Sequence, residues 1–133
     1  MAGKATITVN VNVTGIGDNI DVSNTKAITV PVEVVHGFTV VATAQTTAIA
    51  LGSITEHIAL AKTIGIYIKA EVGTIYINVD TAGTGTFAAA AADLVLNQSE
   101  ACFLPINPAG NLGVQIDASA VTDAFSWIVL AKA

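Results

Sequence analysis

Alternation of aliphatic and polar residues dominates this chain, and it predicts β-strands. Residues 6–13 carry Ile or Val at every odd position and Thr or Asn at every even one. A period of two places the aliphatic side chains on one face of a strand and the polar side chains on the other. The pattern returns over 28–34, where Pro31 has no N–H to donate and therefore indicates a sheet edge or a bulge.

Turn-forming residues divide the rest of the chain into further short strands. Gly37 is interpreted as the end of the second strand, and Gly73 as part of a hairpin loop between two strands that follow each other. Eight or nine short strands with turns at nearly regular spacing predict one all-β domain over 1–133, a sandwich or a barrel. The further strands expected are 38–44, 48–51, 65–70, 74–79, 101–106, 112–116 and 125–130.

Two segments fit more than one kind of structure. Residues 53–62 fit either one helical turn or a strand, because apolar side chains recur there at helical spacing among β-rich neighbours. The alanine run 88–92 has high helix propensity. Five residues are too few to nucleate a helix alone, so a strand is expected over 87–96.

The charge content is unusually low, and it predicts an assembly component. The 133 residues include five lysines, no arginine and ten acidic side chains, whereas about a quarter of an average domain is charged. A folded monomer of this size exposes roughly 6,500 Å², or about 430 Å² for each charge. Such a surface is either neutral or covered by another subunit, so we expect a homo-oligomer. Residues 1–45 are expected to form an N-terminal β-arm or edge strands involved in assembly, since uncovered edges favour aggregation.

Composition also argues against several classes of partner. The apolar run 87–92 ends at Asp93, far short of the about 20 residues that span a membrane. Residues 1–6 do not resemble a signal peptide. A net charge of −5 without arginine argues against nucleic-acid binding. The single cysteine, Cys102, excludes an internal disulfide and a thiolate zinc site.

Groups suited to catalysis or metal binding are scarce. His36 and His57 are the neutral general bases, and His36 beside Gly37 is interpreted as an exposed turn histidine. Glu56 and His57 diverge on a strand, and no second histidine stands at ligand spacing, so no zinc site is expected. Cys102 lies in an apolar run without an adjacent Lys or His and is interpreted as a small buried hydrophobe. No catalytic residue and no cofactor are expected.

Oxygen-bearing side chains gather near the first glycine turn, at Asp18, Asn19, Asp21 and Asn24. Calcium takes six to eight oxygen ligands, but no EF-hand spacing is present and Asx residues favour turns for conformational reasons. These residues are therefore interpreted as turn formers, with no metal bound. The same interpretation, as turn or edge residues, applies to Asp80, Asp117 and Asp123.

Aromatic residues amount to 5% of the chain, and two roles are open to them. Tyr67, Tyr76, Phe125 and Trp127 would make a sugar-stacking platform if they converged, but anchors of a core or an interface are expected instead. Along 125–130, alternation places the odd-numbered side chains on the face that we expect to be buried. The candidate core or interface residues are Phe38, Val40, Phe125, Trp127 and Val129.

The order of segments from about Thr46 to Ala133 resembles a known group of proteins. A polar turn at 97–100 leads into the strand 101–105, and an aromatic-aliphatic strand closes the chain. This is similar to small tailed-phage virion proteins with a jelly-roll-like β-sandwich, which decorate capsids or form minor capsid or fibre parts and are commonly trimeric. Their Pro-Gly-Glu turn has Gln98-Ser99-Glu100 as its counterpart here.

The resemblance implies an antiparallel jelly-roll-like sandwich of about eight strands and a non-enzymatic structural role. The expected partners are further copies of the chain, as a trimer, and the major capsid protein or other virion proteins. The expected location is the virion, after synthesis in the host cytoplasm. The alternative is a carbohydrate- or receptor-binding module of a phage fibre or tail, for which Tyr76, Asn78 and Asp80 are the nearest candidates.

Overall fold

The computed structural model describes residues 4–15, 20–28, 33–41, 49–51, 60–80, 89–107, 109 and 113–132. Within these ranges the chain forms ten strands and two single-turn 3₁₀ helices, with no α-helix, which confirms the all-β prediction. The elements are β1 Ala5–Val13, β2 Ile20–Ile28, β3 Glu33–Val40, β4 Ile49–Leu51, η1 Leu60–Lys62, β5 Thr63–Val72, β6 Ile75–Asp80, η2 Ala89–Ala91, β7 Leu94–Leu96, β8 Ala101–Pro105, β9 Gly113–Ala118 and β10 Ala124–Ala131.

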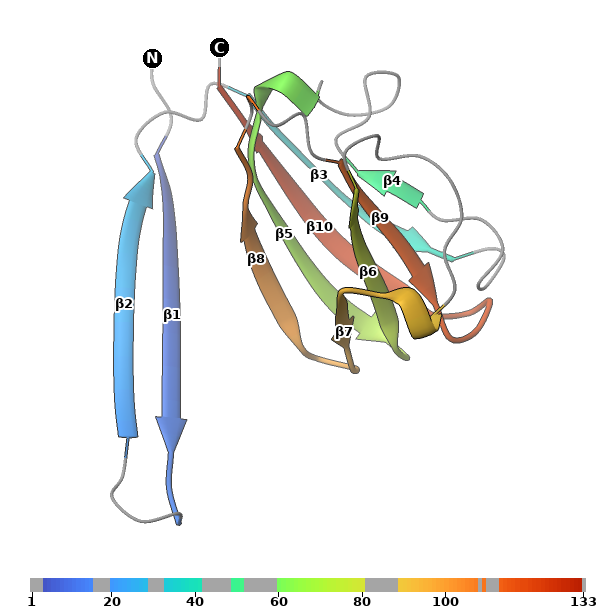
Figure 1. Cartoon of the computed structure of the whole chain (residues 1–133), viewed down its shortest axis with the longest axis horizontal. Helices are drawn as coiled ribbons and strands as arrows, with labels where there is room; N and C mark the ends of the chain where they lie inside the picture. The colour runs from blue at the N-terminus through green and yellow to red at the C-terminus, as the bar shows by residue number, and fades with distance from the viewer. Residues whose placement is uncertain are drawn as a thin grey trace.

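Eight of these strands form a sandwich of two four-stranded antiparallel sheets (Figure 1). The strand orders are β3-β10-β5-β8 in the first sheet and β4-β9-β6-β7 in the second. The pairings are nested along the chain, because β6 pairs with β7, β5 with β8, β4 with β9 and β3 with β10. A long hairpin of four strand pairs wound into two facing sheets is the jelly roll, so the predicted jelly-roll-like sandwich is confirmed.

The hydrophobic core lies between the two sheets. Alternate residues of β5 and β6, among them Ile66, Ile68, Ile75 and Ile77, have no exposed surface and belong to one cluster. Trp127 of β10 joins the same cluster. The strict period of two in these strands therefore supplies the inner face of each sheet.

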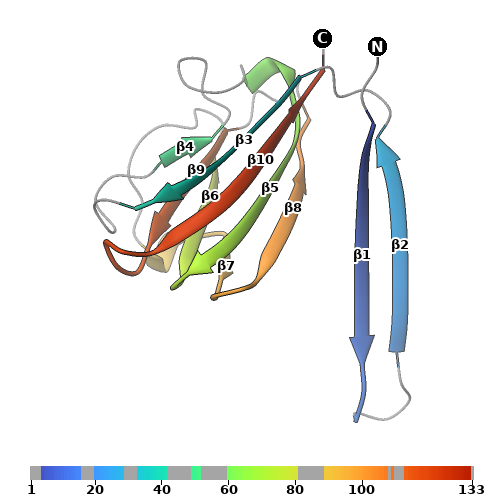
Figure 2. The same ribbon diagram turned by 180° about the vertical axis from the view of Figure 1, so that it is seen from behind.

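The first two strands form a hairpin outside the sandwich. β1 and β2 pair over nine positions, from Ala5 opposite Ile28 to Val13 opposite Ile20, and among the described residues neither strand pairs with the two sheets. The hairpin lies beside β8 and extends past the end of the sandwich (Figures 1 and 2). β1 and β2 thus form a β-ribbon, whereas β3 is an edge strand of the sandwich.

The strand expected over 28–34 is described only at its two ends, where Ile28 belongs to β2 and Glu33 and Val34 belong to β3. Residues 29–32 lie outside the described ranges. The pattern also missed most of β2, in which Asp21 and Asn24 resemble turn residues. These polar side chains lie in a strand because the strong alternation of β1 provides a partner over its full length.

Gly37 does not end a strand, since β3 continues through it. Its role is to make room for an aromatic ring: a Cβ atom at Gly37 would lie 2.7 Å from Cζ2 of Trp127. Trp127 also donates a hydrogen bond from Nε1 to the hydroxyl of Thr39 at 3.0 Å. The close contact of backbone and indole explains why glycine is tolerated inside this strand.

The connection between β5 and β6 is not the expected hairpin loop, because the two strands belong to different sheets. Gly73 turns the chain with a φ of 70°, a conformation that glycine adopts without strain. The Asp123 carboxylate accepts hydrogen bonds from the backbone N–H of Thr74 at 3.2 Å and of Ala120 at 3.1 Å, and from the hydroxyl of Ser119 at 2.6 Å. The Asp123 carboxylate therefore joins the connection between β5 and β6 to the turn between β9 and β10.

The two ambiguous segments contain single-turn 3₁₀ helices and one short strand where the structure describes them. The strand expected over 87–96 is wrong for 89–91, which form η2, and only 94–96 form a strand. Of 53–62, the structure describes only 60–62, which form η1. Alanine-rich sequence here favours a single tight turn, in agreement with the high cost of nucleating a longer helix.

The polar turn between β7 and β8 contains a strained residue. Ser99 has a φ of 72°, and its backbone N–H donates to the Ala70 carbonyl at 2.8 Å. The Glu100 carboxylate accepts a hydrogen bond from the N–H of Asn97 at 2.7 Å and so closes the turn. Glycine would adopt the left-handed conformation of Ser99 without strain.

Ser99→Gly is expected to raise the free energy of unfolding by about 0.5–1 kcal/mol. Relief of the left-handed strain, about 1–2 kcal/mol for a non-glycine residue, outweighs the added freedom of glycine in the unfolded chain. Urea denaturation measures the change. Gln98→Gly is the control and should destabilise, because Gln98 does not have a positive φ. A Ser99→Gly variant less stable than the wild type would contradict this prediction.

Candidate interaction surfaces

The outward side of the β3-β10-β5-β8 sheet is apolar and exposed. Its outer apolar face comprises five side chains: Val34, Phe38, Val40, Val72 and Ile128. Phe38 is 62% exposed, and Val34 and Val40 are each more than half exposed. The register places Val40 and Val72 on either side of Ala124, and the sheet presents β3 and β10 toward the viewer in Figure 2. His36 and Ser126 lie on the same side, opposite Ile128 and Phe38, so polar groups interrupt the apolar side chains. Exposed apolar clusters often mark interaction surfaces.

One polar cluster lies within the outer apolar face, where Ser126 pairs with Phe38 on one side and Lys69 on the other. Lys69 Nζ lies 2.8 Å from Glu71 Oε2, and the Ser126 hydroxyl donates to Glu71 Oε1 at 2.7 Å. The hydrogen bond from Lys69, followed by the one from Ser126, lowers the pKa of the Glu71 carboxyl below its ordinary value. The same carboxylate raises the pKa of Lys69. The two charges compensate each other, so this cluster adds no net charge to the face.

The β1–β2 hairpin has one polar and one apolar face. On the polar face, the Thr8 and Thr25 hydroxyls lie 3.1 Å apart, and Ser23 donates to the Asn10 side chain at 2.6 Å. The hairpin apolar face comprises Ile7, Val9, Val11 and Val22, and it also carries Lys26 and Asn24, the cross-strand partners of Ile7 and Val9. Val9, Val11 and Val22 are 48–55% exposed. The polar face is thus internally bonded, whereas the apolar face lies open to solvent.

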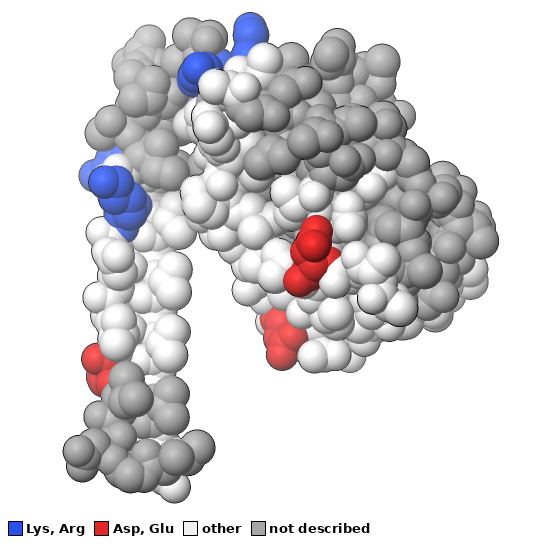
Figure 3. All heavy atoms as spheres, viewed as in Figure 1, with Lys and Arg blue, Asp and Glu red and all other residues white. Residues whose placement is uncertain are grey.

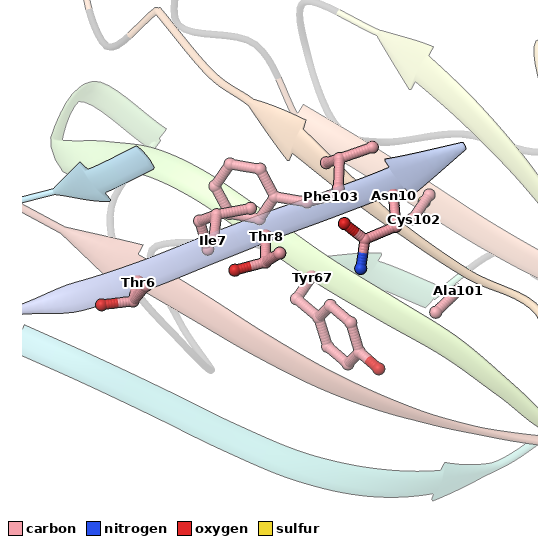
Figure 4. A pocket seen from close by; sticks show the side chains of 9 residues that line it. Thr6, Ile7, Thr8, Asn10, Tyr67, Ala101, Cys102 and Phe103 are labelled. Atoms are coloured by element: carbon pink, nitrogen blue, oxygen red, sulfur yellow. The ribbon is translucent and has the colours of Figure 1, made fainter. Parts of the chain in front are cut away.

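A groove of about 430 Å³ separates the hairpin from the sandwich. Residues 6–10 of β1 line one side, and Tyr67 of β5 with residues 101–103 of β8 line the other (Figure 4). Burial raises the pKa of the Cys102 thiol in this wall, which lowers its reactivity. The lining offers hydroxyl, amide and aromatic groups but no carboxylate, imidazole or amine, a composition suited to packing against a peptide.

The candidate core or interface residues divide between two locations. Phe125, Trp127 and Val129 lie in the core, with at most 6% exposure. Phe38 and Val40 point away from the core, on the outer apolar face. The first three therefore stabilise the sandwich, and the last two are available for contact with another molecule.

A sugar-stacking platform of four aromatic residues is ruled out by their positions. Phe125 and Trp127 are buried between the sheets, whereas Tyr67 lies on the outer side of the first sheet and Tyr76 on the outer side of the second. Asn78 shares the outer side of β6 with Tyr76, but its amide donates to the Ala91 carbonyl at 3.3 Å. The aromatic side chains thus do not converge.

The expected turn and edge residues differ in burial from one another. His36 is exposed, but on strand β3 rather than in a turn. Asp21 and Asn24 lie on opposite faces of β2, so they do not join as ligands, and no group of three His, Cys, Asp or Glu that could hold a metal occurs among the described residues. Asp123 lies in a turn, as expected, although it is buried there. Asp117 is buried within β9, an inner strand of its sheet, which contradicts its interpretation as a turn or edge residue.

Some candidates cannot be placed, because Asp18, Asn19, Glu56 and His57 lie outside the described ranges. Asp123 is the residue whose role sequence reasoning missed. Its position between Ala120 and β10 indicated a turn, and two of its three hydrogen-bond donors, Ser119 and Ala120, lie in that turn. The third donor, Thr74, is 49 positions away in the chain, and the sequence does not show that it is a neighbour.

Comparison with known proteins returns no match: no protein-family model, no curated protein and no solved structure is similar to this chain. In the described part of the chain, no helix has the length and apolar character to cross a membrane. Charged atoms are sparse on the face seen in Figure 3, where acidic side chains lie on the sandwich and near the hairpin tip. The functional argument therefore rests on the chain's own surfaces.

Proposed function

We propose that this protein is a non-enzymatic structural protein of a tailed-phage virion, a decoration or minor capsid component that binds neighbouring subunits. The observation that carries the proposal is the outer apolar face, on which Val34, Phe38 and Val40 are each more than half exposed. These side chains project from a closed jelly roll whose core is already filled by other residues. They therefore serve contact with another molecule rather than the stability of the single subunit.

Burial of this face provides the free energy of association. Full burial of one Val or Phe side chain contributes about 1.5–3 kcal/mol, and five such side chains lie together here. The neighbouring charges of Lys69 and Glu71 compensate each other and need not be separated on contact. We expect a homotrimer, made in the host cytoplasm and located in the virion, with the major capsid protein or other virion proteins as further partners.

A carbohydrate- or receptor-binding module of a fibre or tail is the second candidate. It is supported by Tyr76 and Asn78, which share the outer side of β6 in the second sheet. An aromatic ring beside an amide is a common arrangement for sugar recognition. In that case the second sheet would hold the ligand, and Tyr76→Ala would abolish binding to a glycan array without changing the oligomeric state.

Phe38→Glu is expected to dissociate the oligomer, since it places a charge in the centre of the outer apolar face. Size exclusion with light scattering should give a mass well above 13.5 kDa for the wild type and a monomer mass for Phe38→Glu. The matched control is Val95→Glu, which makes the same change at a similarly exposed residue of β7 in the other sheet and should leave the oligomer intact. A wild-type monomer at micromolar concentration contradicts the proposed self-association.

A further inference from the structure

We propose that the groove between the β1–β2 hairpin and the sandwich receives an extended, uncharged segment of a different polypeptide, which adds a strand between β1 and β8. This inference goes beyond the proposed function, because it does not involve the outer apolar face and concerns a second kind of contact. It rests on two strand edges that lie on either side of the groove.

Each side of the groove is formed by the edge of a sheet (Figure 4). Among the described strands, β8 pairs with β5 alone and β1 pairs with β2 alone. Five consecutive residues of β1, 6–10, line the groove, as do three consecutive residues of β8, 101–103. Consecutive residues belong to opposite faces of a strand, so the edge of each strand, with its backbone, borders the groove.

The backbone groups that β8 presents to the groove follow from its pairing with β5. The Ala70 N–H donates to the Glu100 carbonyl at 2.9 Å, and Ile106 donates from its N–H to a β5 carbonyl at 3.1 Å. Residues of an antiparallel strand direct their N–H and C=O groups toward the partner strand and away from it in alternation. The even-numbered residues therefore bond β5, whereas Ala101 and Phe103 direct their N–H and C=O groups toward the groove.

The side chains beside this edge leave its backbone accessible. A Cβ atom at Gly65 would lie 2.5 Å from Cζ of Phe103, so the Phe103 ring lies over β5 and not over the free edge. Ala101 is exposed and has only a methyl side chain. Pro105, the next residue of this alternation, has no N–H to donate, and it ends the stretch that can pair fully. The accessible donors thus belong to the part of β8 that lines the groove.

Backbone groups on both sides of one groove select a peptide as the ligand. An added strand pairs its own N–H and C=O groups with those of a sheet edge, and here it would do so along both of its sides. Residues 6–10 span about 17 Å, so a strand of about five residues fits. The side chains that line the groove are all uncharged, so an uncharged segment enters without desolvating a charge.

The added strand has to come from a segment that is not yet paired. All ten described strands of this chain already pair with at least one neighbour, so none of them offers two free edges to a second copy. An extended tail or linker of another protein has both edges free until it binds, and it becomes ordered on binding. The chemistry of the groove therefore fits a segment of a different polypeptide.

A pool of synthetic heptapeptides composed of Val, Thr, Ala, Ser and Tyr tests the groove. We expect members of the pool to bind the full chain and to slow the hydrogen exchange of the Ala101 and Phe103 N–H groups several-fold, as measured by NMR. The same peptides with N-methyl groups at alternate residues keep their side chains but lose the donors along one edge. These methylated peptides are the control and should not bind.

Ala101→Pro removes one N–H that faces the groove and leaves the bonds to β5 in place. Its affinity for the peptides is expected to fall about tenfold, as the loss of one backbone hydrogen bond predicts. The matched control, Ala101→Val, keeps this N–H and should bind like the wild type. Circular dichroism checks that both variants fold.

Several results would overturn the strand addition. These are the absence of binding by the whole pool at millimolar concentration, protection of N–H groups outside the groove alone, and equal binding by Ala101→Pro and Ala101→Val. Protection of the two N–H groups by raising the concentration of the protein alone would identify a second copy as the occupant and would also contradict the proposal. Phe38→Glu should bind the peptides like the wild type, so failure of the proposed self-association is distinguishable from failure of the groove to bind.

Discussion

Trp127→Ala is expected to lower the free energy of unfolding by about 3–5 kcal/mol and to abolish soluble assembly. The indole is 6% exposed, lies over Gly37 and donates to Thr39 at 3.0 Å, so its removal leaves a cavity and an unbonded hydroxyl. A typical domain is stable by only about 5–15 kcal/mol. Urea denaturation followed by circular dichroism, together with the soluble fraction after expression, measures the loss.

Two further variants show which property of Trp127 accounts for the loss of stability and whether the loss is specific to this residue. Trp127→Phe keeps an aromatic ring but loses the hydrogen bond, so a clearly smaller effect is expected. His36→Ala removes an exposed side chain on the outer side of β3, opposite Ile128, and should leave folding intact. If Trp127→Ala retained wild-type stability but lost binding to a sugar or receptor, the recognition module would replace the structural protein as the better interpretation.

Asp123→Ala is expected to destabilise the sandwich by on the order of 3 kcal/mol. The substitution leaves the N–H groups of Thr74 and Ala120 and the hydroxyl of Ser119 without their acceptor, and a lost bond to a charged group costs about 1.5–3 kcal/mol. It also disconnects the two turns that the carboxylate joins. The midpoint of urea unfolding measures the effect.

Asp93→Ala serves as the control for this prediction. Asp93 also accepts a backbone hydrogen bond, from Val79 at 2.8 Å, but it is exposed, so water replaces the lost contact. Its loss should cost about 1 kcal/mol or less. Equal destabilisation by Asp93→Ala and Asp123→Ala would show that the buried carboxylate has no special role in holding the turns together.

The individual strands were largely predictable from the sequence, because alternation is a local property. Residues 6–13 and 125–130 differ from β1 and β10 by only one residue at either end. The period of two also predicted which side chains of β10 face inward, as the burial of Phe125, Trp127 and Val129 shows. Local periodicity therefore determined the all-β class and the inner faces of the strands.

The pairing of strands was not predictable in the same way, since it depends on residues far apart in the chain. Thr39 and Trp127 are 88 positions apart, and their contact explains why Gly37 continues a strand. Asp123 acts on Thr74 across 49 positions, and this contact explains why Gly73 lies in a crossover rather than a hairpin. In both cases the sequence predicts a local turn at a glycine whose place in the fold depends on a distant side chain.

The candidate interaction surface was predictable only in part. Phe38 and Val40 stand out in the sequence, but β3 carries aliphatic residues on both sides, such as Val34 outward and Val35 against the core. Alternation therefore could not separate the core side from the exposed side. The apolar stripe of β1 was evident from the sequence, whereas the absence of a cover for it could be seen only from the arrangement of the described strands.

The nested order of the strand pairs determines when the outer apolar face comes into existence during folding. The length of chain that each pair encloses increases from β6–β7 to β3–β10. The entropy cost of closing a loop rises with its length, so β6–β7 forms most easily and β3–β10 closes last. Because the outer apolar face is made mainly by β3 and β10, a partly folded chain cannot present it, and only a finished sandwich can enter an assembly.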